Sequence, residues 1–355
     1  MADADSMRAL AWLATTDGAA LLAEAAAMPD DRLTRLTRLR KRAPADIAAI
    51  AVELLELRRR ARAKFDRADQ MYFTPEGLEQ ATGDAIAAYR AGRFAEGAGV
   101  LDACSGIGGD ARHLARRGPV LAVDRSPAAA LCTRHNSVVR TLCADVTSLP
   151  LARLRDHGIR AAFFDPSRRT DRASGGRRRL RSGEDYAPPL HWLEPLRAHF
   201  ESVAVKVSPA IDDPALRIPD VRVEFLSDRG ECKEAVLWFG PPAEGFSSPP
   251  AATEPYFATV LRRGSAPATL SPTACPTLTF GAPRAYLYEP DAAVIRAHLV
   301  NQLAERLSAV SIEPGIAYMT SDLYVATPFA TAFRVVDVLS YREKEVQRRL
   351  RTLGA

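Results

Sequence analysis

Residues 100–124 place two carboxylates around a glycine-rich turn, an arrangement suited to holding a nucleoside. The stretch reads VLDACSGIGGDARHLARRGPVLAVD, in which Asp102 ends one apolar run and Asp124 ends the next. The turn between them contains Gly106, Gly108 and Gly109. Glycine lets the backbone take positive φ and lets a ligand approach the main chain. A carboxylate at the tip of the second run can accept both hydroxyls of a ribose.

The elements that must position these residues form half of a parallel βαβ unit. Val100 to Ala103 and Val120 to Val123 are short apolar runs typical of buried strands. Asp110 to Arg117 has helical spacing, and Gly118-Pro119 ends the helix. The first turn of such a helix directs unpaired N–H groups and a positive dipole end at the glycine turn.

Two nucleotide cofactors are compatible with this unit. Gly106, Gly108 and Ala111 match the dinucleotide pattern G-x-G-x-x-A. S-adenosylmethionine is the other candidate, because Asp102 could pair with its ammonium group. An NAD-dependent oxidoreductase is the weaker alternative, since no His or Tyr is placed to serve a hydride site. A tight turn without any ligand is the plain structural reading.

The spacing Asp-x-x-x-Gly-x-Gly-Gly resembles motif I of class I methyltransferases, and DACSGIGGD is especially similar to the trimethylguanosine-synthase-like branch. Asp145, just past the third predicted strand, matches the position that accepts the adenine amino group in that family. Capping of the following helix is the other role open to Asp145. The resemblance implies these cofactor-binding residues: Asp102, Cys104, Gly106, Gly108, Gly109, Asp124 and Asp145.

A second motif follows the fourth predicted strand, Ala161 to Phe164. Asp165-Pro166-Ser167 resembles motif IV of amino-methyltransferases, Asp/Asn-Pro-Pro-aromatic. A carboxylate and the Pro166 carbonyl can accept two N–H groups of an amine and direct its lone pair at the methyl group. The sequence departs from the family pattern, because Ser167 replaces the second proline and Arg168 replaces the aromatic residue that stacks on a base.

Basic residues cluster beside this motif. Seven arginines lie between positions 168 and 181: Arg168, Arg169, Arg172, Arg177, Arg178, Arg179 and Arg181. Arginine forks to phosphates and stacks on bases, so we expect the first four to contact an RNA substrate. A solvated surface loop is the alternative. Lys206, in the next apolar run, either points into the cleft or extends its ammonium to solvent.

The domain organisation has four parts. Residues 1–70 are a helical region, with basic residues around 32–42 and 58–60 that suit either RNA or a solvated face. Residues 71–243 are the predicted methyltransferase domain, in which Thr74-Pro75 begins a helix that ends near Gly92. Residues 244–283 are a linker with a short strand. Residues 284–355 resemble the THUMP-like module found after the methyltransferase core in a group of bacterial proteins.

The fold class implied by the resemblance is α/β. It consists of a Rossmann-like sheet of order 3-2-1-4-5-7-6, a helical N-terminal region and an α+β THUMP-like end. THUMP domains bind RNA, and the THUMP-like resemblance is an analogy of fold; the partner we expect is an RNA substrate.

Composition limits the function classes. The 355 residues are 47% apolar, enough for a large core, and the net charge of +5 suits nucleic acid without requiring it. The five cysteines form no C-x-x-C pair, so we expect no metal site and a reduced, cytoplasmic protein. No apolar run reaches 18 residues, and the first 30 residues lack the pattern of a signal peptide.

The predicted function is an S-adenosylmethionine-dependent methyltransferase that acts on RNA at a base nitrogen. Asp165, Pro166 and Ser167 are its candidate catalytic residues. Two alternatives stay open: a methyltransferase of a small molecule or protein, and a non-catalytic RNA-binding protein that retains a relic cofactor fold. The sequence does not fix the oligomeric state.

Overall fold

The computed structural model describes residues 2–29, 31–168, 183–241, 255–273, 277 and 279–354. The chain divides into two compact units. The first comprises Met1–Val221 and Ala235–Phe246, and the second comprises Arg222–Glu234 and Ser247–Ala355. This division differs in kind from the four predicted parts, whose boundaries stay a prediction.

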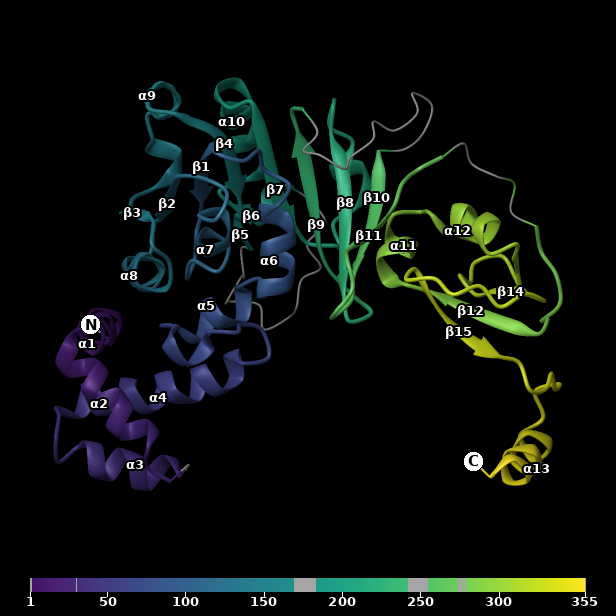
Figure 1. Cartoon of the computed structure of the whole chain (residues 1–355), viewed down its shortest axis with the longest axis horizontal. Helices are drawn as coiled ribbons and strands as arrows, with labels where there is room; N and C mark the ends of the chain where they lie inside the picture. The colour runs from purple at the N-terminus through teal and green to yellow at the C-terminus, as the bar shows by residue number, and fades with distance from the viewer. Residues whose placement is uncertain are drawn as a thin grey trace. The chain divides into compact units, whose positions relative to one another are not determined.

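The first unit begins with a cluster of four helices, drawn in purple and blue in Figure 1: α1 (Ala2–Leu13), α2 (Thr16–Ala26), α3 (Arg32–Leu39) and α4 (Ala45–Ala61). Side chains end the loops between them, since Thr15 accepts from the N–H of Gly18 and Asp31 accepts from that of Thr34. The apolar stripes of these helices form one core whose centre includes Leu13, Leu39 and Leu54.

A short connection leads from the helical cluster to the sheet: η1 (Ala68–Gln70), α5 (Pro75–Gln80) and α6 (Asp84–Ala91). The sequence predicts one helix here, and that prediction is wrong. Helix α5 ends early because the Lys64 ammonium donates to the carbonyl oxygens of Leu78, Glu79 and Ala81. These bonds satisfy carbonyl oxygens at the C-terminus of α5. Gly83, which has extended backbone, then precedes the first residue of α6.

The sheet of the first unit contains five parallel strands and one antiparallel strand. They are β1 (Gly99–Ala103), β2 (Val120–Asp124), β3 (Arg140–Cys143), β4 (Ile159–Phe164), β7 (Ser202–Val207) and β9 (Glu231–Phe239). Their order is β9-β7-β4-β1-β2-β3, as can be followed in Figure 1. Strand β1 lies in the middle and is buried along its whole length, as expected for a strand covered on both faces.

Short elements connect these strands. They are α7 (Ala111–Leu114), α8 (Pro127–Asn136), η2 (Val146–Ser148), α9 (Leu151–Asp156), β5 (Ser167–Arg168), η3 (Gly183–Asp185), β6 (Tyr186–Ala187), η4 (Leu190–Trp192), α10 (Leu193–His199) and η5 (Asp213–Leu216). Helix α8 begins as predicted, since the Ser126 hydroxyl accepts from the N–H of Ala129 and Pro127 occupies the first turn.

The second unit contains two groups of strands. Strand β10 (Tyr256–Leu261) pairs in parallel with β8 (Arg222–Asp228) and antiparallel with β11 (Ala268–Leu270). The predicted linker therefore carries two strands. A four-stranded sheet follows in the order β13 (Val310–Ser311), β14 (Met319–Ser321), β12 (Tyr286–Pro290) and β15 (Ala330–Arg334). Its helices are α11 (Ala292–Arg296), α12 (Val300–Arg306) and α13 (Glu343–Leu353).

One side chain in the first unit joins three backbone groups that are far apart in sequence. Asn136, the last residue of α8, accepts from the N–H of Tyr72 (2.7 Å) and donates to its carbonyl oxygen (2.8 Å). The same amide donates to the carbonyl oxygen of Ile107 in the glycine turn (2.9 Å). The segment before α5 is thereby held on the glycine turn. We call residues 71–74 the strap.

Replacing Asn136 should therefore destabilise the first unit. Asn136→Ala leaves two acceptors and one donor of the backbone without their partner, each costing about 1–3 kcal/mol where water cannot replace it. We expect a loss of about 2 kcal/mol, seen as a melting temperature lower by several degrees. Arg134→Ala, at an exposed position of the same helix, is the control and should stay within about 0.5 kcal/mol of the parent chain. Equal melting temperatures for the two variants would contradict the assignment.

Candidate functional site

The carboxyl ends of strands β1, β2 and β4 meet at one edge of the sheet. The N–H of Asp165 donates to the carbonyl oxygen of Ala103 at 3.0 Å, and the N–H of Cys104 donates to that of Val123 at 2.9 Å. Residues 102–105 and 165, and the adjoining tip of β2, are therefore neighbours. Ligands of open parallel sheets bind at such an edge, so the structure brings the predicted site residues of both motifs together.

The glycine turn has the backbone that its sequence requires. Gly106 and Gly108 have φ of +55° and +79°, and the non-glycine Cys104 has φ of +67°. A Cβ atom at Gly108 would lie 3.0 Å from Cα of Thr133, whereas one at Gly106 would meet no protein atom within 4 Å. Gly106 therefore faces open space, and Gly108 faces helix α8. Left-handed backbone at a non-glycine residue is uncommon and is often found at functional sites.

Asp102 is a fully buried carboxyl group without a partner. Its exposed fraction is 0%, and neither carboxylate oxygen has a hydrogen bond to a described residue. Burial raises the pKa of Asp102 well above its ordinary value, the charges of Asp110 and Asp165 raise it further, and that of Arg90 opposes them. Since buried polar groups are normally paired, this carboxyl group is suited to receive a cation.

Asp124 is held in place by two backbone donors. Its Oδ2 accepts from the N–H of Gly106 at 2.9 Å and its Oδ1 from the N–H of Ser126 at 2.8 Å. Burial raises its pKa, while these two bonds oppose the shift. A carboxylate oxygen has two lone pairs, so each oxygen retains one for a hydroxyl group.

Asp145 caps the turn that follows β3. Its Oδ1 accepts from both the N–H (2.9 Å) and the hydroxyl (2.7 Å) of Thr147. These bonds lower its pKa, and the side chain is exposed. The capping role that the sequence offered is confirmed. The contact with adenine stays a prediction.

Asp165 forms an ion pair with Lys206 of the adjacent strand. The Lys206 ammonium donates to Asp165 Oδ2 at 2.7 Å, and the exposed fractions of the two side chains are 15% and 26%. The parallel register pairs Phe164 with Val205, so the next residues of β4 and β7 lie beside each other. The sequence left two readings for Lys206; its ammonium lies at Asp165 and is little exposed, which disagrees with extension to solvent.

Ser167 and Arg168 begin the stem of a hairpin next to Asp165. Strand β5 pairs with β6, matching Ser167 with Ala187 and Arg168 with Tyr186. The Ser167 hydroxyl donates to the Ala187 carbonyl oxygen at 3.1 Å, and Pro166 is buried. The side chain of Arg168 and the whole of Arg169, Arg172 and Arg177 lie outside the described residues. The described stem therefore holds residues 167–168 and 186–187 next to each other, just after Asp165 and Pro166.

Two residues of this region gave little signal in the sequence. Arg90 is buried within α6, bonds to Asp110 and lies over the ring of Phe163 at 4.4 Å from its centroid. It contributes the positive charge that faces Asp102. Asn136 had no signal, because its partners are 64 and 29 residues away. Only a helix pattern combined with a known register could have revealed either contact.

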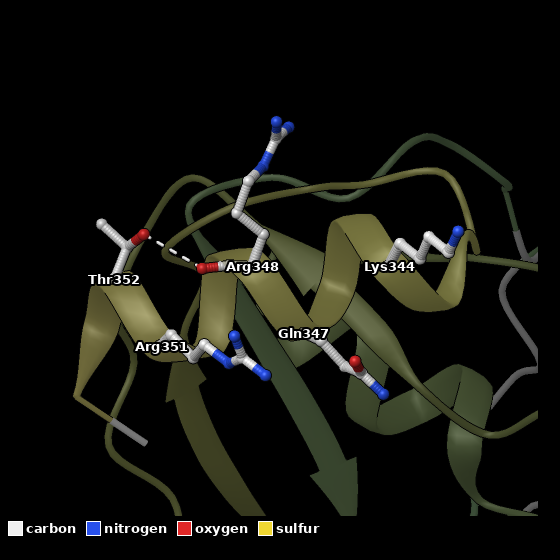
Figure 2. Close-up of a pocket in the computed structure, with 5 residues that line it drawn as sticks. All are labelled: Lys344, Gln347, Arg348, Arg351 and Thr352. Atoms are coloured by element: carbon white, nitrogen blue, oxygen red, sulfur yellow. Dashed lines mark hydrogen bonds between the residues drawn. The ribbon is translucent and has the colours of Figure 1, made fainter.

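The second unit contains a hollow of about 490 Å³ beside helix α13. Figure 2 shows the residues that line it, all from one helix: Lys344, Gln347, Arg348, Arg351 and Thr352. It contains three cationic side chains and no carboxylate, so it does not resemble the strand-end site.

Among the described residues, no three His, Cys, Asp or Glu side chains are grouped to hold a metal ion. None of the described helices is long and apolar enough to span a membrane.

Comparison with known proteins identifies the family. The chain is 31% identical over 321 residues to an uncharacterized S-adenosylmethionine-dependent methyltransferase found in two strains of Mycobacterium tuberculosis, and the match covers 87% of this chain and 83% of the relative. The chain belongs to the S-adenosylmethionine-dependent methyltransferases. Its cofactor is S-adenosylmethionine, and it is an enzyme.

Two further comparisons concern the fold of this methyltransferase and its N-terminal region. A crystal structure of a protein named a putative methyltransferase, from Porphyromonas gingivalis W83, matches with a TM-score of 0.70 at 19% identity, covering 99% of this chain and 86% of that one. The methyltransferase therefore has a Rossmann-like α/β fold with a large mixed sheet. Residues 5–61 match a family described as a domain of unknown function, DUF8688.

The residues at the strand ends suit this cofactor. S-adenosylmethionine carries an ammonium, a cationic sulfur and a ribose with two hydroxyls. The unpartnered carboxyl group of Asp102 suits a cation, the open space at Gly106 suits close approach to the backbone, and the free lone pairs of Asp124 suit a ribose. When bound, the cofactor supplies a methyl group on a positively charged sulfur.

The two glycines should respond differently to alanine. Both substitutions force a side chain into left-handed backbone, at a cost of roughly 1–2 kcal/mol. Gly108→Ala also crowds Thr133 and should lower the melting temperature more than Gly106→Ala. Gly106→Ala adds its methyl group to the open space and should weaken S-adenosylmethionine binding at least tenfold by calorimetry. Unchanged affinity in Gly106→Ala would show that the cofactor lies elsewhere.

Cofactor binding should be linked to the titration of Asp102. Burial raises the pKa of Asp102 and so favours its protonated form in the free enzyme, whereas a bound ammonium favours the carboxylate. Binding should therefore release a proton, and affinity should rise with pH until Asp102 is ionised in the free enzyme. Calorimetry in two buffers of different ionisation enthalpy measures the protons released. Asp102→Asn is the control, because the titration of the ligand itself is the same with both proteins. Equal proton release would contradict the linkage.

Proposed function

We propose that this enzyme methylates RNA at a base nitrogen. In this proposal Asp102 pairs with the cofactor ammonium, Asp124 holds the ribose and Asp145 contacts the adenine amino group. The observation that carries the proposal is the meeting of the unpartnered Asp102 carboxyl group with Asp165 at one sheet edge, where the charge of Asp165 raises the pKa of Asp102. Cys104 and the three glycines form the turn over which the cofactor lies.

Asp165 is the proposed residue that binds the acceptor. Its carboxylate has one oxygen, Oδ1, that is not bonded to Lys206, and this oxygen accepts an N–H of the base. The Pro166 carbonyl orients the same group. Ser167 acts indirectly, since its hydroxyl secures the hairpin stem. Methyl transfer needs little more than alignment of acceptor and methyl carbon, so most of the rate comes from proximity and orientation.

RNA is the proposed substrate because cationic groups occur in two suitable places. Arg168, Arg169, Arg172 and Arg177 belong to a segment whose described stem begins beside Asp165. In the second unit, Lys344, Arg348 and Arg351 lie on helix α13 at spacings of four and three residues (Figure 2). Such spacing places them on one helix face, and phosphate contacts of this kind position an RNA without reading its sequence.

The proposal also includes the two finer resemblances noted in the sequence, one for the core and one for the C-terminal module. We assign the core to the trimethylguanosine-synthase-like branch with sheet order 3-2-1-4-5-7-6, and residues 284–355 to a THUMP-like module. The four-stranded sheet with α11, α12 and α13 is an α+β arrangement that agrees with this assignment. The enzyme is proposed to act in the cytoplasm.

Transfer of tritium from labelled S-adenosylmethionine to RNA tests this function. Asp165→Ala should retain cofactor affinity and lose turnover, because its side chain serves the acceptor. Asp124→Ala should lose one or two charge-assisted hydrogen bonds of about 1.5–3 kcal/mol each, which weakens cofactor binding roughly tenfold or more. Asp156→Ala, at an exposed position of α9, is the control.

The tritium-transfer assay is also run in a cell extract. Treatment of that extract with ribonuclease distinguishes RNA from other methyl acceptors. Label that stays in macromolecules after ribonuclease digestion would indicate a protein, and label that never enters a macromolecule would indicate a small molecule. Either result would contradict the proposed substrate. Turnover by Asp165→Ala at the parent rate would contradict the proposed site.

A further inference from the structure

The ion pair between Asp165 and Lys206 constrains the kind of atom that is methylated. The two charged groups are 2.7 Å apart, and both side chains are largely shielded from solvent. The positive charge of Lys206 offsets the negative charge of Asp165 at the strand end. The Asp165 carboxylate is therefore not an isolated negative charge. The group to be methylated meets both a hydrogen-bond donor, Lys206, and a hydrogen-bond acceptor, Asp165.

The charge that develops on the acceptor decides which chemistry this pair favours. An exocyclic amine becomes positively charged as it is methylated, and a neighbouring ammonium opposes that charge. A ring imide nitrogen instead gives up its N–H proton, and negative charge develops on the nitrogen and its neighbouring carbonyl oxygen. A positioned ammonium stabilises such developing negative charge. Lys206 thus favours an acceptor that loses a proton.

The hydrogen-bonding pattern of the pair favours the same acceptor. Asp165 offers the free lone pairs of Oδ1, and Lys206 offers the donors of an ammonium. The imide edge of guanine or uracil presents an N–H next to a carbonyl oxygen, which is the complementary pattern. Neither Ser167 nor Arg168 supplies the stacking ring that the amine-methylating motif has at this place.

We infer that the methyl acceptor is the ring imide nitrogen of a guanine or uracil, with Asp165 accepting its proton and Lys206 donating to the adjacent carbonyl oxygen. The new N–C bond forms as the C–S bond of the cofactor breaks, the C–S electron pair stays on sulfur, and the imide proton passes to the Asp165 carboxylate. This inference rests on the proposed RNA methyltransferase function and names the acceptor within it.

Identification of the methylated nucleoside tests the inference directly. The full-length enzyme is incubated with labelled cofactor and unmodified ribosomal and transfer RNA transcripts. The RNA is then digested to nucleosides, which are separated by chromatography and identified by mass spectrometry. Label in 1-methylguanosine or 3-methyluridine is the expected result. Label on an exocyclic amine or on a ribose oxygen overturns the inference while leaving RNA methylation in place. Absence of label from all RNA overturns the proposed function itself.

Variants of Lys206 test its role separately. Lys206→Met should reduce kcat by about 10²–10³-fold, as for loss of one donor to a developing negative charge, with cofactor affinity by calorimetry within twofold of the parent. Lys206→Arg retains a donor and should recover part of that loss. Lys233→Met, which removes an exposed lysine paired with Glu231, is the matched control. A kcat of Lys206→Met equal to that of the control would refute the role.

Discussion

The parallel register of β1 with its two neighbours is the constraint on which the rest of this site depends. β1 pairs with β2 through Ala103 and Val123 and with β4 through Ala103 and Phe164. Each strand therefore ends at the same level, and the residue after each end faces the same edge. Carboxylates from three distant parts of the sequence gather there without any direct contact among them. A shift of register between β1 and β4 would separate the two motifs, and a shift between β1 and β2 would separate Asp102 from Asp124.

The helical N-terminal region is joined to the glycine turn through the strap. Arg58 of α4 donates to the carbonyl oxygen of Met71 at 2.9 Å and lies over the Tyr72 ring. The Tyr72 hydroxyl donates to the carbonyl oxygen of Leu13, and Asn136 bonds both backbone groups of Tyr72. A region matching a family of unknown function thus supports the segment that lies on the glycine turn.

Local patterns in the sequence were enough to predict the strand–turn–helix unit, the carboxylate at each strand end and the cap at Ser126. These features follow from apolar runs, glycines and hydroxyl groups within a few residues of one another. The partner of Asp165 and the three bonds of Asn136 could not be predicted, because they depend on register and on packing between distant segments. The break between α5 and α6 was missed for the same reason, since Lys64 comes from before the strap. Asp145 shows the limit of a motif: its cap was predictable, whereas a ligand contact at the same residue cannot be seen in local sequence.

In the proposed binding mode, the cofactor lies over the tips of β1 and β2 with its methyl group directed at Asp165. A crystal structure of the full chain with S-adenosylhomocysteine and a guanine- or uracil-containing oligonucleotide tests it most directly. We expect the ligand ammonium at Asp102, the ribose hydroxyls at Asp124, and the sulfur facing Asp165 and Lys206. A ligand bound elsewhere, or a sulfur directed away from Asp165, would contradict it.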